Sequence, residues 1–116
     1  MAGLGGGQEL VHVITSHNEE EWFTRLYAGG IIADEQLEKL GIKAKDVRVF
    51  LKAQINKQGE KTRLFADCET EPEGDWTYSY KITDRNPELE LTAAKECISY
   101  KGALVFVHHF LLSPIK

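Results

Sequence analysis

The chain has 116 residues and a mass of 13.1 kDa, which is enough for one hydrophobic core and excludes a second independent domain. Apolar residues make up 42% and charged residues 28%, so the composition excludes a disordered or fibrous chain. The formal net charge of -4 excludes a uniformly basic nucleic-acid coat, and any anion-binding surface must therefore be local.

The sequence favours a cytoplasmic protein without a membrane partner. The N-terminus lacks the basic and apolar segments of a signal peptide. The longest apolar run, 103–112, is interrupted by His108 and His109 and is too short to span a bilayer. Cys68 and Cys97 are too few for a disulfide framework, so we expect two partly buried thiols in a reducing compartment.

The N-terminal residues predict a flexible tail followed by a strand. Glycine dominates residues 1–8, which is the composition of a linker, so residues 9–116 are predicted to form the single domain. These glycines do not match a phosphate-binding loop. The run from Leu10 to Thr15 is continuously apolar, which predicts a strand covered on both faces and a buried His12.

Two helices are predicted next. Ser16 and Glu19 have the spacing of a capping box, which predicts a helix start. The stripe that follows has helical spacing and ends at 29–30 in a pair of glycines; it consists of Trp22, Phe23, Leu26 and Tyr27. A second, shorter helix is predicted from Asp34 to Leu40, with Gly41 as its stop.

Residues 46–83 predict a three-stranded antiparallel meander. Apolar and polar residues alternate through 47–55, which is typical of a strand, and alternate again through 61–69 after a turn at 58–59. A two-residue hairpin loop there would place Ala53 opposite Leu64 and Arg48 opposite Glu69, so that both faces agree in character. Residues 76–83 alternate in the same way and supply the third strand.

The C-terminal part predicts a helix and a final strand. Asn86 and Pro87 have the pattern of a helix start, and a helical stripe runs from there to Gly102. The apolar run 103–112 predicts a strand that ends before Pro114. The predicted order is therefore β-α-α-β-β-β-α-β, an α+β fold with helices packed on a mixed sheet.

The main candidate site is the outward face of the predicted central hairpin. Phe50 and Phe65 would be diagonal neighbours there. The basic residues that would surround them are Arg48, Lys52, Arg63 and Lys81. Aromatic rings among cations can stack bases or form a hot spot for a protein partner. A third interpretation places this face under a helix, with both rings in the core.

A helix-turn-helix is the alternative interpretation of the same region. Leu40-Gly41-Ile42 followed by apolar residues at 47, 50 and 51 is similar to a turn that leads into a recognition helix, with the next hairpin as a wing. The groove-facing residues would then be Lys43, Lys45, Arg48 and Lys52. The two-residue alternation favours a strand instead.

The acidic segment and the histidines predict no metal or catalytic site. Carboxylates occupy every second position from Asp67 to Asp75, but the segment lacks a calcium-loop pattern and reads as a solvated turn, useful at most against a basic partner surface. His108 and His109 point to opposite faces of their predicted strand. If the first and last strands were adjacent, His12 could meet one of them as an acid/base pair.

These features favour a small, non-catalytic protein-binding domain that acts through a sheet face, in an inhibitor, immunity-type or adaptor role. The partner is expected to be a protein, and no cofactor is expected. The first alternative is single-stranded nucleic-acid binding through Phe50 and Phe65, or winged-helix binding to DNA. The second alternative is a histidine-based nuclease or hydrolase.

Overall fold

The computed structural model describes residues 5–14, 17–58 and 66–115, which form six strands and two helices. In chain order these are β1 (Gly5–Ile14), β2 (Glu20–Ile31), α1 (Asp34–Leu40), α2 (Ala44–Gln58), β3 (Cys68–Glu69), β4 (Trp76–Asn86), β5 (Leu91–Tyr100) and β6 (Ala103–Pro114). The α+β class is confirmed. Neither described helix has the length and apolar character needed to cross a membrane.

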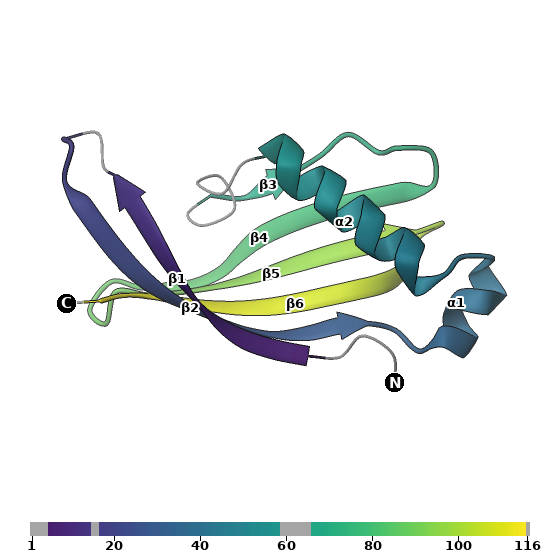
Figure 1. The fold of residues 1–116 in the computed structure, drawn as a ribbon, viewed down its shortest axis with the longest axis horizontal. Helices are drawn as coiled ribbons and strands as arrows, with labels where there is room; N and C mark the ends of the chain where they lie inside the picture. The colour runs from purple at the N-terminus through teal and green to yellow at the C-terminus, as the bar shows by residue number, and fades with distance from the viewer. Residues whose placement is uncertain (1–4, 15–16, 59–65, 116) are drawn as a thin grey trace.

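The strands form one sheet in the order β1-β2-β6-β5-β4-β3, and every neighbouring pair is antiparallel. The predicted mixed sheet is therefore wrong. Figure 1 shows α2 lying across one face of this sheet, with the β1–β2 hairpin extending past the helix. We call the face under α2 the covered face and the opposite one the open face.

Four predicted elements are confirmed in type and place. The run that begins at Leu10 lies in β1, helix α1 has the predicted bounds, and residues 76–83 and 103–112 lie in β4 and β6. Gly41 ends α1 in a left-handed conformation at φ 78°, as its C-cap position requires. The predicted tail is corrected, because residues 5–8 pair with β2 as the first part of β1, while residues 1–4 lie outside the described part.

The first predicted helix, 16–28, is wrong, and most of this segment forms strand β2. Phe23 and Arg25 are buried at alternate positions, and Trp22 and Leu26 point to the other face, so the large side chains serve both sides of a strand. Gly29 has a φ of 132°, and a Cβ there would lie closer than 3.0 Å to the Val107 carbonyl oxygen of β6. Strands β2 and β6 therefore approach each other closely at Gly29.

The predicted strand 46–56 is also wrong, because these residues lie in helix α2. Val47, Phe50 and Gln54 are buried at helical spacing. Lys43 donates its backbone N–H to the Asp46 carboxylate at 2.9 Å, which is one half of a capping box. The predicted hairpin register and the three-stranded meander therefore do not form; residues 61–65 of the predicted second strand lie outside the described part.

The last predicted helix is corrected to strand β5, so the observed order is β-β-α-α-β-β-β-β. Asn86 accepts a hydrogen bond from the Leu89 backbone N–H at 3.0 Å. This contact closes the turn between β4 and β5 instead of starting a helix, because asparagine favours both structures. Ala94, Glu96 and Ile98 are then buried at alternate positions on the covered face.

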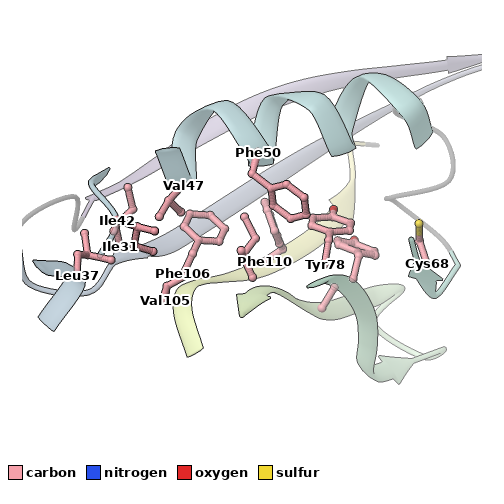
Figure 2. Close-up of a cluster of buried hydrophobic side chains, with 13 residues drawn as sticks. Ile31, Leu37, Ile42, Val47, Phe50, Cys68, Tyr78, Val105, Phe106 and Phe110 are labelled. Carbon is pink, nitrogen blue, oxygen red and sulfur yellow. The ribbon is translucent and has the colours of Figure 1, made fainter. Parts of the chain in front are cut away.

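The main core lies between α2 and the covered face (Figure 2). Val47 and Phe50 reach down from α2, and Leu37 closes the end near α1. The strands contribute Ile31, Tyr78, Tyr80, Ala94, Ile98, Phe106 and Phe110. Because successive strand residues point to opposite sides, residues such as Ser79, Lys95 and His109, each one position from a covered-face residue, point to the open face.

Candidate functional surfaces

Phe50 belongs to the core, which corrects the predicted aromatic contact site. Its side chain is 7% exposed, and its ring stacks on Trp76 with the ring centroids 5.0 Å apart. Trp76 in turn lies 4.7 Å from the ring of Tyr100. A ring enclosed in this way cannot stack on a base or insert into a partner protein.

The structure does not bring the predicted basic residues together around Phe50. Arg48 and Lys52 are exposed on α2, whereas Lys81 of β4 lies on the open face. The Lys81 ammonium lies 3.3 Å from a carboxylate oxygen of Glu69. Phe65 and Arg63, the remaining members of the predicted site, lie outside the described residues.

A basic stripe follows the outer surface of α2 and the turn before it. Its side chains are exposed and are the ones that the helix-turn-helix interpretation assigned to a DNA groove: Lys43, Lys45, Arg48 and Lys52. The local order of a helix, a left-handed Gly41 and a second helix is confirmed. Contact with DNA stays a prediction, and most of the segment predicted as a wing lies outside the described residues.

The acidic segment, residues 67–75, is held against β4 and α2 by side-chain contacts. Asp67 accepts a hydrogen bond from the Ile82 backbone N–H at 2.8 Å, and Glu73 forms an ion pair with Lys57 of α2. The hydrogen bond from Lys57 lowers the pKa of Glu73. In the described part of the chain, no three His, Cys, Asp or Glu residues are grouped so that they could hold a metal ion.

The histidines do not converge. His108 pairs with Glu96 on the covered face and His109 with Lys95 on the open face, which confirms their opposite directions. Strand β2 separates β1 from β6, so His12 does not meet either of them. His12 is not buried as predicted, because β1 is an edge strand; its ring stacks on Trp22 at 4.4 Å.

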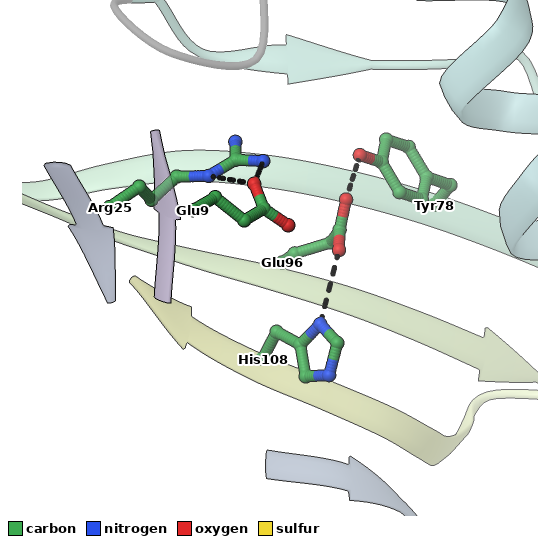
Figure 3. Close-up of polar contacts among 5 residues, drawn as sticks. All are labelled: Glu9, Arg25, Tyr78, Glu96 and His108. Carbon is green, nitrogen blue, oxygen red and sulfur yellow. Dashed lines mark hydrogen bonds and ion pairs between the residues drawn. The ribbon is translucent and has the colours of Figure 1, made fainter. Parts of the chain in front are cut away.

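A polar cluster that the sequence did not reveal lies within the covered face (Figure 3). Glu96 is fully buried and accepts a hydrogen bond from the Tyr78 hydroxyl at 2.5 Å. Its other carboxylate oxygen lies 3.7 Å from Nδ1 of His108. The His108 ring is enclosed by those of Phe106 and Phe110, 4.5 and 5.7 Å away. The Glu96 carboxylate is therefore shielded from solvent between β4, β5 and β6.

A second polar contact joins β1 to β2 (Figure 3). Arg25 is 8% exposed and donates from Nε to a Glu9 carboxylate oxygen at 3.0 Å. Its guanidinium lies 4.9 Å from the centre of the Phe110 ring. The buried charge is thus satisfied across the β1–β2 pair, and it orders the hairpin where α2 no longer covers the sheet.

The open face carries a stripe of exposed apolar side chains, which we call the apolar stripe. It consists of Leu10 (67% exposed), Trp22 (45%), Leu26 (47%) and Leu111 (44%). Leu26 of β2 lies directly opposite Leu111 of β6. Leu10 of β1 lies opposite Thr24 of β2, and Trp22 and Leu26 are the next open-face residues on either side of Thr24. The stripe therefore crosses β1, β2 and β6 without interruption by a charged residue.

A shallow depression of about 380 Å³ continues the apolar stripe across the sheet. Its lining includes Leu26, Ala28, Ala93, His109 and Leu111. The cross-strand row beside it is basic, because His109 pairs with Lys95 and Lys95 with Lys81. Sequence reasoning missed this surface because it placed Trp22, Phe23 and Leu26 on one side of a helix.

Comparisons with protein-family models, with curated proteins and with solved structures found no match. The Glu96 cluster is enclosed, and the basic stripe of α2 flanks a single exposed apolar side chain, Val49. The open face combines an exposed apolar centre with a polar border.

Proposed function

We propose that this chain is a non-catalytic protein-binding domain and that the open face is its contact surface. The apolar stripe is the observation that carries this proposal. Four large apolar side chains, each between 44% and 67% exposed, lie around Thr24 on the open face of three adjacent strands. Contiguous exposed apolar patches with polar surroundings are typical of protein interaction sites.

The apolar stripe has the energetic character of an interface centre. Full burial of a leucine or similar side chain contributes about 1.5–3 kcal/mol. Trp22 belongs to a residue type that dominates interface hot spots, and its ring is already ordered by the stack on His12. Strands β2 and β6 are paired on both sides, so this surface loses little conformational freedom when a partner binds.

The border of the open face indicates the chemistry of the partner. Lys95 and Lys81 lie in one cross-strand row beside the depression. Apolar interface centres surrounded by polar residues exclude water, and charges on the border guide the approach of the partner. Because Lys81 is paired with Glu69, Lys95 supplies the positive charge of this border, which favours a partner whose own surface is apolar at its centre and acidic beside Lys95.

Matched glutamate substitutions test this function. Leu26→Glu and Leu111→Glu place a charge in the apolar stripe, while Val49→Glu places the same charge at a 60% exposed apolar position on α2. A partner captured with the wild-type protein is purified and titrated against each variant. We expect the two stripe variants to bind about tenfold more weakly or worse, a loss of ~1.4 kcal/mol or more. Val49→Glu should bind like the wild type, and all three should melt at the wild-type temperature.

Two results would contradict the proposal. Equal affinity of wild type and both stripe variants would exclude the open face as the contact. The second result is that the wild-type protein retards RNA or DNA, that Arg48→Ala and Lys52→Ala do not, and that no protein partner is recovered. This result would assign the function to the basic stripe of α2, because each lost phosphate contact weakens nucleic-acid binding and its salt dependence.

A further inference from the structure

The two edges of the sheet differ in how they are protected. At the β4 edge, the short strand β3 pairs with β4, and Thr70 donates its backbone N–H to the Tyr78 carbonyl oxygen at 3.4 Å. Asp67 then accepts the Ile82 backbone N–H at 2.8 Å, and a bulge lies between Ile82 and Asp84. Side-chain capping and bulges of this kind prevent further strand pairing.

The β1 edge carries none of these protections. Strand β1 is ten residues long, and its register with β2 runs from Gly5 to Ile14 without a shift. Within the described part of the chain, no backbone hydrogen bond joins residues 6–13 to anything outside β2. The strand contains no proline, lysine or arginine, and Glu9 is held by Arg25 on the covered-face side. A long edge of this kind is a template for another strand.

We propose that the β1 edge binds the β1 strand of a second copy of this chain. The two strands would pair antiparallel about a two-fold axis, so that two six-stranded sheets become one continuous sheet. Closed two-fold pairing is the commonest arrangement of identical chains. This inference goes beyond the proposed function, because it uses the edge of the sheet and leaves the open face available.

The side chains of β1 favour their own copy as the partner. Pairing partners in β2 show that Leu10 and His12 point to the open face, while Glu9, Val11 and Val13 point to the other side. A register centred on Val11 places Leu10 opposite His12 and Glu9 opposite Val13. Side chains then meet on matching faces, and no two like charges face each other.

The apolar stripe reaches the β1 edge, whereas Gly6 and Gly7 are explained within the chain itself, because a Cβ at either position would meet Tyr27 of β2. Leu10 is 67% exposed beside the edge, so pairing would bring together the apolar stripes of both copies. The open face of the dimer would then carry a larger apolar surface than the open face of one copy.

Lysine substitutions separate the edge from the open face. Gln8→Lys with Leu10→Lys places two protective charges on β1, and Leu26→Lys places the same charge on the inner strand β2, where the side chain is 47% exposed on the same face. Mass is measured by sedimentation and by light scattering. We expect the wild type and Leu26→Lys to have twice the chain mass of 13.1 kDa and the double β1 variant to have the single mass.

Amide exchange of the wild-type protein supplies a readout that needs no variant. Pairing should protect every second backbone amide of residues 8–14 as the protein concentration rises, because only alternate N–H groups point outward. A wild-type protein that stays monomeric, with unprotected β1 amides at the highest concentration, would overturn this inference and leave the proposed function intact. If Leu26→Lys also abolishes the dimer, the two copies meet through the open face, and this result overturns the edge contact too.

Discussion

Phe50→Ala is expected to lower the free energy of unfolding by about 3–5 kcal/mol, the range for removing a buried phenylalanine ring. The ring is 7% exposed and joins α2 to the sheet through its stack on Trp76. A domain of this size is stabilised by roughly 5–15 kcal/mol in total, so this one truncation removes much of its stability. Unfolding in urea, followed by circular dichroism, measures the loss.

Val49→Ala is the matched control for this change. Val49 precedes Phe50 on α2 but is 60% exposed, so its truncation should change the free energy of unfolding by no more than about 0.5 kcal/mol. A small loss in Phe50→Ala, together with a large one in Val49→Ala, would mean that the segment is not a helix with this orientation. That result would instead support the predicted strand, in which Val49 points inward and Phe50 points outward.

Gly29→Ala is expected to be the second most damaging change, with a loss of roughly 3–5 kcal/mol from backbone strain and steric overlap together. The backbone of Gly29 has a φ of 132°, and a Cβ would lie closer than 3.0 Å to the Val107 carbonyl oxygen. That oxygen belongs to the neighbouring strand β6, so it cannot rotate away as a side chain would. Strand β2 would have to separate from β6 to accept the alanine.

Gly41→Ala isolates the conformational part of this effect. Gly41 also has a positive φ, of 78°, but nothing lies within 4 Å of the position that its Cβ would occupy. We expect a loss of only about 1 kcal/mol there. Thermal melting of the two variants side by side is the measurement. Equal losses would mean that β2 and β6 do not approach each other as closely as described.

Local signals explain which elements could be predicted from the sequence. Helix α1 is flanked by clear boundaries, because its first turn is acidic and Gly41 ends it. In α2, the apolar residues at 47, 49, 51, 53 and 55 alternate like a strand, yet the apolar residues at 47, 50 and 51 also follow helical spacing. The Lys43 backbone N–H is capped by Asp46, but lysine is not a preferred N-cap residue, so the sequence contains no clear start signal for this helix.

Strands β2 and β5 could not be predicted for a different reason. The residues from Trp22 to Tyr27 are large on both faces, because β2 packs against the core on one side and carries the apolar stripe on the other. Such a strand has no simple alternation. Asn86 starts a turn as readily as a helix. In both cases the pairing with distant β6 decides the structure, and a local window does not contain it.

The candidate surfaces depend even more on long-range pairing. The basic residues of α2 are adjacent in sequence, so a helical interpretation places them on one surface without further information. The apolar stripe instead joins Leu10, Trp22 and Leu26 to Leu111, which is more than eighty positions further along the chain. Strand β6 must lie beside β2 before these side chains form one surface.

Oxidative footprinting with the captured partner tests the central claim, that the open face is the contact surface, most directly. Side-chain oxidation is compared for the free protein and for its purified complex, position by position. We expect protection of Trp22, Leu26 and Leu111 in the complex, because contact would exclude water from the apolar stripe. Val49, an apolar side chain on α2 that is 60% exposed, should be oxidised equally in both. Protection of Val49 with unchanged oxidation of Trp22 and Leu26 would contradict the account.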